Sequence, residues 1–451
     1  MGRLFGTDGV RGVANTELTC EMAMNIGKAA AMVLISDEVK HPTFLIGKDT
    51  RISGDMLQGA LVAGLCSVGA NVKLLGVVPT PAVAYLINKY KADAGIMISA
   101  SHNPYRYNGI KIFNEDGYKL PDDLEEQIES IVLDEDSADY FVPADGAIGT
   151  VELCENAVDD YIDHVVDSVE YKLDGMNIAL DCSNGSAATT AEKMFTRLGA
   201  NCHMLSDSPD GININEDCGS THMENLMQYV KDHKMDAGLA FDGDADRCLA
   251  VDDNGELVDG DYVIAICAAD LKSRGRLKKN TVVGTVMTNM GFNKFCEAND
   301  MNFVATKVGD RYVLETMLAQ GYNMGGEQSG HVIYLDYATT GDGQLTGAHL
   351  LSLINRRNAK LSSIATLMQR YPQVLINVKI TNEGKLHFYT DKEIKKEIKR
   401  IENILGGKGR VLIRVSGTEP LVRVMLEGEV LEEIEVLAQN AADLIQARLG
   451  A

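Results

Sequence analysis

Three separated stretches of this chain repeat one pattern, in which a helix ends at a glycine and a short strand follows. The stretches read LCSVGANVKLL from Leu65, MFTRLGANCHML from Met194 and MLAQGYNMGG from Met317. Their glycines, Gly69, Gly199 and Gly321, lie 130 and 122 residues apart, and glycine is the usual residue just after a helix. An apolar strand, a turn with Asp or Asn and a helix precede each stretch; these strands lie near Phe44, Asn177 and Thr281. The repeat predicts three related βαβ domains instead of one large sheet.

Residues 370–451 do not continue this pattern. They contain three strand-like runs, Val374–Ile380, Arg410–Val415 and Leu421–Glu427, and two runs with helical spacing, Asp391–Leu405 and Val430–Leu449. We therefore expect an α/β chain with three related domains at residues 1–150, 151–253 and 254–369. A smaller α+β domain is expected at residues 370–451.

Composition narrows the class of protein. The chain has 451 residues, 45% of them hydrophobic and 24% charged, as in an ordinary globular protein. Its net charge of −23 argues against a general nucleic-acid or membrane surface, so an anionic substrate needs a local cluster of cations. Nine cysteines without a CxxC pair fit reduced thiols in the cytoplasm better than a disulfide framework. No run approaches the roughly 18 apolar residues of a membrane span.

The segment from Ile96 to Phe113 carries the first candidate site. It reads as a buried strand, a polar loop with Ser101, His102 and Asn103, and a second extended run from Gly109 that contains Lys111. Ser101 follows the carboxyl end of the first strand, where open α/β sheets place their ligands. A hydroxyl, an imidazole and a lysine are what a phosphoryl-accepting nucleophile needs. The alternative is a polar turn between two strands.

The second candidate is DGDADR, directly after an apolar strand at Ala237–Phe241. Asp242, Asp244 and Asp246 alternate in a tight turn, so their carboxylates can converge on one hard cation, for which Mg²⁺ is the natural occupant. An EF-hand would need Gly and Glu where Arg247 and Asp253 stand. The alternative is a solvated acidic turn.

The third candidate is GGEQSGH, from Gly325 to His331. Its glycines let the backbone approach a ligand closely. Glu327 and Ser329 can exchange hydrogen bonds with sugar hydroxyls. A structural hairpin explains the same residues.

The fourth candidate is RVSGTEP with a following arginine. Backbone N–H groups, two hydroxyls and two arginines can form a phosphate clamp, made of Arg414, Ser416, Gly417, Thr418 and Arg423. A surface turn with incidental charges is the alternative. The amino-terminal FGTDGVRG turn carries Arg11 but specifies no chemistry by itself. The absence of GxxxxGK[ST] and GxGxxG stretches weakens the case for a nucleotide-driven kinase or a dinucleotide enzyme.

Taken together and in this order, the motifs GTDGVRG, SASHNP, DGDADR, GGEQSGH and VSGTEPLVRVM are similar to those of the α-D-phosphohexomutase superfamily, over nearly the whole chain. The form with Gln328 and the later LDYATTGDG resembles the members that act on glucosamine phosphates. Tyr107 and Val415 depart from the residues common in the superfamily, acidic and proline respectively, and neither is assigned to chemistry.

The resemblance implies that the chain is an isomerase. Its domains would be built on mixed sheets and would surround a central cleft. Ser101 would be carried as phosphoserine, and its phosphate would join Asp242, Asp244 and Asp246 around Mg²⁺. Lys111, Arg11, His102, Arg247 and His331 would surround the transferred group. Glu327 and Ser329 would contact the sugar, and Arg414, Ser416, Gly417, Thr418 and Arg423 would hold the phosphate that does not react.

The implied reaction converts glucosamine 6-phosphate into glucosamine 1-phosphate through a bisphosphorylated sugar, and it feeds UDP-N-acetylglucosamine and peptidoglycan synthesis. A homodimer through the first domain, a rotation of the last domain over substrate and a cytoplasmic location are further expectations. Three competing hypotheses remain: a mutase for neutral glucose or mannose phosphates, a phosphatase using Asp242 as nucleophile, and a phosphosugar sensor without catalysis.

Overall fold

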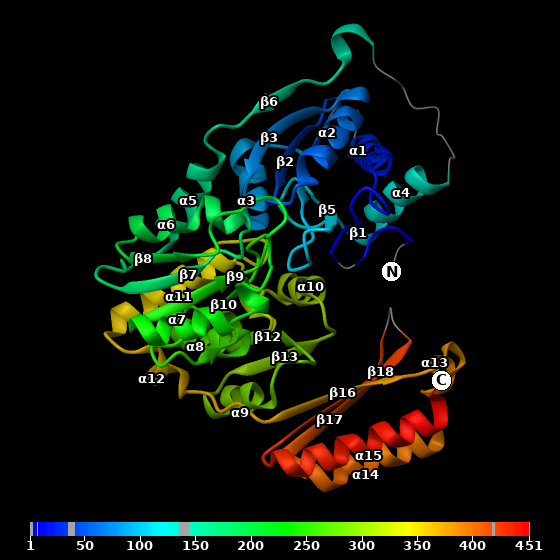
Figure 1. Cartoon of the computed structure of the whole chain (residues 1–451), viewed down its shortest axis with the longest axis vertical. Coiled ribbons are helices and arrows are strands. Elements are labelled where there is room, and N and C mark those ends of the chain that lie inside the picture. The colour runs from blue at the N-terminus through cyan, green and yellow to red at the C-terminus, as the bar shows by residue number, and fades with distance from the viewer. Residues whose placement is uncertain (1–2, 7, 35–40, 135–143, 417–419, 451) are drawn as a thin grey trace. The chain divides into compact units, whose positions relative to one another are not determined.

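The computed structural model describes residues 3–6, 8–34, 41–134, 144–416 and 420–450 (Figure 1). By their mutual contacts they form two compact units. One comprises Met1–Met287 and Met301–Leu367, and the other comprises Thr288–Asp300 and Met368–Ala451. Within the described ranges, none of the helices combines the length and apolar character that a membrane span requires.

The first sheet of the larger unit has six strands. Their spatial order is β1 (Val10–Val13), β5 (Tyr107–Phe113), β4 (Ala94–Ile98), β2 (Thr43–Lys48), β3 (Asn71–Val77) and β6 (Val151–Leu153). Its helices are α1 (Cys20–Leu34), α2 (Gly54–Ser67), α3 (Thr80–Tyr90) and α4 (Asp122–Leu133). Strands β2, β3, β4 and β6 are parallel neighbours, whereas β5 is antiparallel to β4 and β1.

The second and third sheets repeat this arrangement with fewer strands. The second has the order β11 (Leu257–Val258), β10 (Cys248–Val251), β9 (Ala237–Phe241), β7 (Asn177–Asp181) and β8 (Asn201–Leu205), with helices α5 (Ala157–Ser168), α6 (Ala191–Arg197) and α7 (Glu224–His233). The third has the order β13 (Asn302–Thr306), β12 (Thr281–Thr285), β14 (Met324–Gly326) and β15 (Val332–Tyr334), with helices α8 (Gly260–Ser273), α10 (Asp310–Gln320), α11 (Gly343–Arg357) and α12 (Leu361–Ala365). Short 3₁₀ turns occur at Asp145–Ala147, Ser186–Thr189, Gly219–Thr221, Lys278–Asn280 and Gly406–Lys408.

The repeat predicted from the sequence is confirmed in the backbone. The three marker glycines, Gly69, Gly199 and Gly321, have φ of 91°, 99° and 69°, the left-handed conformation that closes a helix before the next strand. In each sheet a strand with a parallel neighbour is followed by an antiparallel one, in the pairs β4–β5, β9–β10 and β14–β15. The loops inside these pairs carry Ser101, the three aspartates and Glu327. The predicted mixed sheets are therefore present, and each places one candidate motif at the same structural position.

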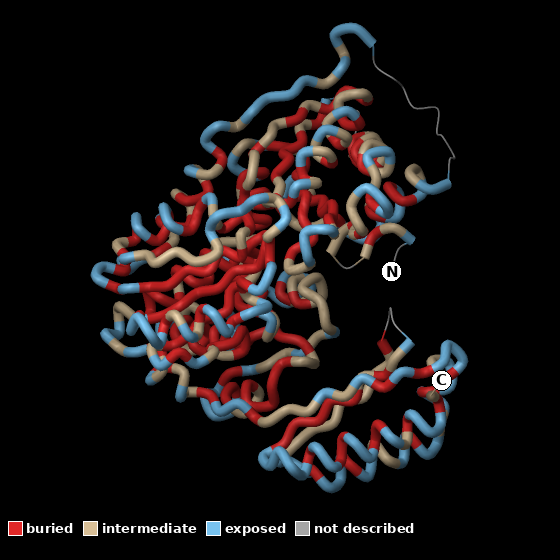
Figure 2. The backbone as a smooth tube through the Cα atoms, viewed as in Figure 1, coloured by how far each residue is buried: buried red, intermediate tan, exposed pale blue. Residues whose placement is uncertain are grey.

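Apolar burial follows the strands of these sheets (Figure 2). The five residues of β4 and the five of β9 are all buried, as expected for central strands covered on both faces. The core of the first sheet joins the inner faces of α1 and α2, including Ile26, Leu57 and Leu61. Rigid central strands thus support the loops that follow them.

The smaller unit is the predicted α+β part. An antiparallel sheet has the order β16 (Gln373–Lys379), β18 (Leu421–Gly428) and β17 (Gly409–Val415), and the unit's helices are α9 (Met290–Ala298), α13 (Asn382–His387), α14 (Lys392–Leu405) and α15 (Leu431–Leu449). Its own apolar core includes Ile401, Val424 and Ala438. The boundaries at residues 150, 253 and 369 stay predictions.

Candidate active site

Ser101 lies in the loop between β4 and β5 and is almost fully buried, at 1% exposure. Its hydroxyl donates to Asp242 Oδ2 at 2.6 Å and lies 3.2 Å from His102 Nδ1. Its φ is 52°, an uncommon left-handed conformation for a residue other than glycine. Such backbone strain persists only where surrounding contacts impose it.

Two side chains impose this conformation by binding the Ser101 carbonyl. Arg51 Nη2 donates to it at 3.0 Å and Asn215 Nδ2 at 2.9 Å. Both donors also bind the carbonyl of Asn103, at 2.5 and 3.1 Å. Gly243 packs so closely against the loop that a Cβ at this position would lie 2.6 Å from the carbonyl oxygen of Ser101. The loops of the first and second sheets are thus fitted to one another.

The three aspartates predicted to bind metal come together in the loop between β9 and β10. Asp242, Asp244 and Asp246 each place one carboxylate oxygen within 4.8 Å of the oxygens of the other two. All three residues are buried. Burial and the neighbouring charges of Asp246 and Asp244 raise the pKa of Asp242 well above its usual range. Asp244 Oδ1 and Asp246 Oδ1 are buried and have no hydrogen-bond partner within the described part of the chain. A divalent cation would satisfy both oxygens and offset this repulsion, so the residues fit a divalent-metal site.

Lys111 is the buried cation of this site. Its ammonium lies 2.8 Å from Asp244 Oδ2, 3.0 Å from Asp8 Oδ2 and 3.5 Å from Asp246 Oδ2. Burial alone would lower its pKa, but the carboxylates, led by that of Asp244, raise it well above the usual value. Lys111 is therefore a fixed positive charge beside the aspartates.

Arg11 and Arg247 complete the cationic side of the site, and the neutral His102 lies beside them. Arg11 pairs with Asp8 through Nη2, and the backbone N–H of Arg247 donates to Asp242 Oδ1 at 3.2 Å. Burial, together with the positive charges of Arg247 and Arg11, lowers the pKa of His102 to about 4. His102 is therefore neutral near neutral pH.

The third loop joins the second through backbone contacts. Arg247 and His331 form an isolated antiparallel bridge, and Cys248 N donates to Gly330 O at 3.0 Å. Neither ring nitrogen of the buried His331 has a hydrogen-bond partner, although Nε2 lies 3.6 Å from Asp310 Oδ2. The loop is also a β14–β15 hairpin, so the structural and functional interpretations of this motif are compatible.

A pocket of about 450 Å³ opens beside these residues. It is lined by Leu4, Gly6, Asp8, Gly9, Arg11, His102, Asp246, Arg247, Val308, Gly309, Asp310, Glu327 and His331. Glu327 belongs to this lining, whereas Ser329 is exposed at the tip of the hairpin and does not. The volume lies within the range of small-molecule sites.

The predicted phosphate clamp belongs to the smaller unit. Arg414 on β17 and Arg423 on β18 are register partners, and Ser416 is buried. Burial and the neighbouring charge of Arg423 lower the pKa of Arg414. Gly417 and Thr418 lie outside the described residues.

Sequence reasoning missed several polar residues that the structure adds. They are Asp8, Arg51, Thr80, Lys119, Asn215 and Asp310. Thr80 Oγ1 donates to Asp244 Oδ2 at 2.6 Å, and Lys119 bridges Asp8 and Asp310. Only Asp8 stood in a motif already singled out, the FGTDGVRG turn; the others carry no local signal.

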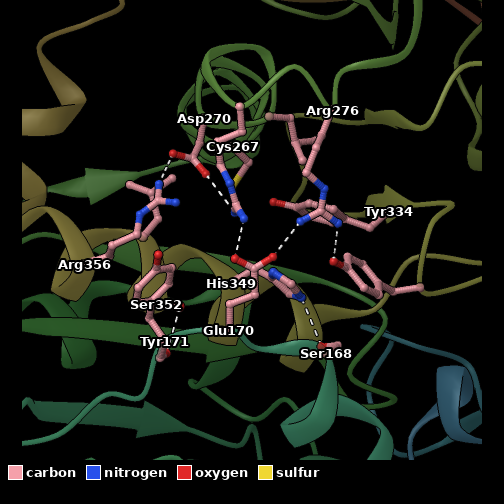
Figure 3. A pocket seen from close by; sticks show the side chains of 14 residues that line it. Ser168, Glu170, Tyr171, Cys267, Asp270, Arg276, Tyr334, His349, Ser352 and Arg356 are labelled. Atoms are coloured by element: carbon pink, nitrogen blue, oxygen red, sulfur yellow. Dashed lines mark hydrogen bonds and ion pairs between the residues drawn. The ribbon is translucent and has the colours of Figure 1, made fainter.

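A second, smaller pocket is lined by none of the residues above (Figure 3). Its cavity of about 40 Å³ has room for about one water molecule. Glu170 forms ion pairs with Arg274 and Arg276, and Asp270 forms ion pairs with Arg274, Arg356 and Arg357. Because both carboxylates are already paired with arginines, we interpret the pocket as a structural contact between the end of α5 and helices α8 and α11.

Family models match the chain from end to end. Models for the phosphoglucomutase/phosphomannomutase α/β/α domains I, II and III match residues 2–139, 159–255 and 259–371, and the model for the C-terminal domain matches residues 375–444. The chain therefore belongs to the phosphoglucomutase/phosphomannomutase family of the phosphohexomutase superfamily.

Relatives place the chain more narrowly within this family. It is 54% identical to the phosphoglucosamine mutase of Clostridium novyi over 451 residues, which is 100% of both chains. A phosphoglucomutase/phosphomannomutase family protein from Burkholderia thailandensis shares the fold with a TM-score of 0.82 at 24% identity, covering 98% of each chain. N-acetylphosphoglucosamine mutase from Aspergillus fumigatus, solved in complex with GlcNAc-6P and magnesium, has a TM-score of 0.67 at 15% identity, covering 98% of this chain and 95% of that chain.

Proposed function

We propose that this protein is a phosphoglucosamine mutase that interconverts glucosamine 6-phosphate and glucosamine 1-phosphate. The observation that carries the proposal is the buried Ser101 hydroxyl, hydrogen-bonded to an aspartate of the acidic triad and placed beside Lys111. Full-length relatives with that name support the amino-sugar substrate. Glucosamine 1-phosphate would then serve UDP-N-acetylglucosamine and peptidoglycan synthesis.

The chemistry would be phosphoryl transfer between Ser101 and the sugar. In one half-reaction the bond between phosphorus and Ser101 Oγ breaks while a bond to the free sugar hydroxyl forms, and that hydroxyl gives up its proton. The bisphosphorylated sugar then reorients within the site, and its other phosphoryl group is transferred to Ser101 Oγ. Such transfer needs positioning and neutralised oxygens more than covalent assistance.

The residues of the pocket have distinct roles in this proposal. Lys111, Arg11 and Arg247 neutralise the oxygens of the transferred group. His331, whose ring nitrogens have no hydrogen-bond partner among the described residues, lines the pocket and takes and returns the hydroxyl proton. His102, neutral because of its lowered pKa, lies against the serine hydroxyl.

We assign Mg²⁺ to the triad formed by Asp242, Asp244 and Asp246, together with the phosphate of Ser101. Three buried carboxylates, two of which have an oxygen without a hydrogen-bond partner among the described residues, are hard ligands that suit this ion. When bound, Mg²⁺ would withdraw charge from the phosphoryl oxygens. The magnesium complex of the Aspergillus fumigatus enzyme supports this choice.

The remaining assignments rest on the family motifs. Glu327 and Ser329 would bind sugar hydroxyls, and Arg414, Ser416, Gly417, Thr418 and Arg423 would bind the phosphate that does not react. The four domains would be residues 1–150, 151–253, 254–369 and 370–451.

We also propose a cytoplasmic homodimer formed through the first domain. All nine cysteines are free thiols, as expected in a reducing compartment. Strand β6 exposes Val151 and Leu153 at the edge of the first sheet. Light scattering at several concentrations tests the dimer, because a constant monomer mass contradicts it.

The first experiment measures phosphate on Ser101 and mutase activity together. Intact mass and phosphopeptides of wild type and Ser101→Ala are compared while sugar-phosphate interconversion is assayed with Mg²⁺. We expect phosphate on Ser101, no activity in the variant, and loss of wild-type activity with chelator that Mg²⁺ restores. An active Ser101→Ala protein, or phosphate on Asp242, overturns the mechanism in favour of a phosphatase that uses Asp242 as nucleophile.

The same assay distinguishes the proposed enzyme from a neutral-sugar mutase and from a phosphosugar sensor. Faster turnover of glucose or mannose phosphates than of glucosamine phosphates would identify a neutral-sugar mutase. Binding of sugar phosphate without isomerisation would identify a sensor.

A further inference from the structure

Glucosamine phosphates differ from glucose phosphates by an ammonium group at C2. Selection of the amino sugar therefore requires an anionic partner inside the pocket. This inference rests on the proposed function. Four carboxylates line the pocket: those of Asp8, Asp246, Asp310 and Glu327. Their existing contacts differ, and these contacts indicate which carboxylate can bind an ammonium group.

Asp8 already uses both of its oxygens. Oδ2 contacts Arg11 and Lys111, and Oδ1 lies 2.5 Å from Lys119 Nζ. Burial would raise its pKa, but these cations, led by Lys111, lower it well below the usual range. An ammonium ion would have to displace one of three existing partners.

Asp246 and Glu327 are engaged in other ways. Asp246 is 5% exposed and belongs to the acidic triad. Glu327 Oε1 accepts from the backbone N–H of Gly309 at 3.1 Å, and Glu327 is assigned to hydroxyl groups that glucosamine and glucose share. Neither Asp246 nor Glu327 is therefore expected to distinguish glucosamine phosphate from glucose phosphate.

Asp310 is the first residue of α10, next to Gly309, where the helix N-terminus favours a negative charge. Its side chain is 17% exposed and lines the pocket. Within the described residues, both of its ionic contacts, to Lys119 and His331, use Oδ2. Burial would raise its pKa, but Lys119 and then His331 lower it, so Asp310 is a carboxylate near neutral pH.

The geometry also links Asp310 to the sugar-binding loop. The Gly309 N–H that holds Glu327 belongs to the residue before Asp310, so the two carboxylates occupy neighbouring positions on one wall. Because the two carboxylates are neighbours, we expect Asp310 to meet the substituent next to a sugar hydroxyl that Glu327 binds. Lys119 does not cancel the Asp310 charge completely, because it is shared with Asp8.

We propose that Asp310 is the specificity-determining residue that binds the C2 ammonium group of the substrate. A hydrogen bond between charged groups contributes about 1.5–3 kcal/mol, which corresponds to a selectivity of roughly 10- to 100-fold.

The test compares kcat/KM for glucosamine 6-phosphate and glucose 6-phosphate in wild type and Asp310→Asn. We expect the amino-to-neutral ratio to fall roughly 10- to 100-fold, while the constant for glucose 6-phosphate changes little. In wild type, KM for the amino substrate should rise as its ammonium group deprotonates at high pH, and Asp310→Asn should lose this dependence. If neutral turnover is too slow, inhibition constants of the two sugar phosphates provide the same ratio.

Two controls separate recognition from structure. Glu327→Gln should lower kcat/KM for both sugars in similar proportion, whereas Lys119→Met, which removes a cation from Asp310 Oδ2, should raise the amino-to-neutral ratio. If Asp310→Asn unfolds, Asp310→Ser replaces it as a second neutral variant. An unchanged ratio in the folded Asp310 variant overturns the inference, whereas wild-type protein without glucosamine-phosphate turnover overturns the proposed function itself.

Discussion

Ser101 combines a strained backbone with a hydroxyl aimed at the acidic triad. Its left-handed φ of 52° costs on the order of 1 kcal/mol, and Arg51 and Asn215 hold it in place through the Ser101 carbonyl. Neither side chain is assigned to substrate. At the scale of single residues, reactivity therefore depends on groups that position the nucleophile.

Replacing Asn215 by alanine should lower kcat roughly tenfold, because small misplacements of a reacting group are costly. KM should change little, since Asn215 does not line the pocket. Steady-state kinetics and the ³¹P signal of the phosphoserine provide the measurement. Asn201→Ala, at an exposed asparagine, serves as the control, and an unchanged kcat in Asn215→Ala would show that Arg51 suffices.

At the scale of elements, the antiparallel strand next to the last parallel strand of each α/β sheet decides where the loops meet. Each candidate loop joins the last parallel strand to an antiparallel partner, so one structural position is used three times. Elsewhere, helix α11 packs against the end of α5. There His349 stacks on Tyr334 with ring centroids 5.4 Å apart, and its Nε2 lies 3.0 Å from the Ser168 hydroxyl.

This packing predicts a pH-dependent stability. Burial, and then the charge of Arg276, lowers the pKa of His349 to about 4, against about 6.5 in an unfolded chain. Between these values the unfolded state binds the extra proton, so stability should fall as pH drops below about 6.5. His349→Gln should show a shallower decline in denaturant titrations from pH 7 to 5. Parallel wild-type and variant curves would contradict this prediction.

At the scale of the whole molecule, two units with separate apolar cores are expected to unfold independently. The smaller unit depends on Glu427, which is fully buried. This carboxylate accepts from Met290 N at 2.9 Å and Arg410 Nε at 2.6 Å. It thus ties the segment around α9 to the C-terminal sheet.

Scanning calorimetry should resolve more than one transition in wild type. Glu427→Ala should shift only the transition of the smaller unit, because removing one partner of a buried charge pair costs about 3 kcal/mol or more. Glu435→Ala, at an exposed position of α15, should shift neither transition. A single cooperative transition that both units share would contradict the expectation.

Much of the fold was predictable because its signals are local. The strand expected at Ala237–Phe241 is β9 with the same bounds, and the run expected from Gly109 begins two residues earlier, at Tyr107. The acidic triad was predictable for the same reason, since its three members alternate within one turn. Ser101, Lys111 and His331 were named as candidate site residues from their motifs, and in the structure they lie in the β4–β5 loop, on strand β5 and in the β14–β15 loop.

The sequence by itself thus determined the elements, the repeat and the motifs, because each depends on residues close together in the chain. Only the tertiary structure decided which groups from separate repeats meet. Lys119 bridges Asp8 and Asp310, and Asn215 binds the Ser101 carbonyl across 114 positions. These contacts depend on how whole domains pack, and no local periodicity or turn pattern encodes that packing.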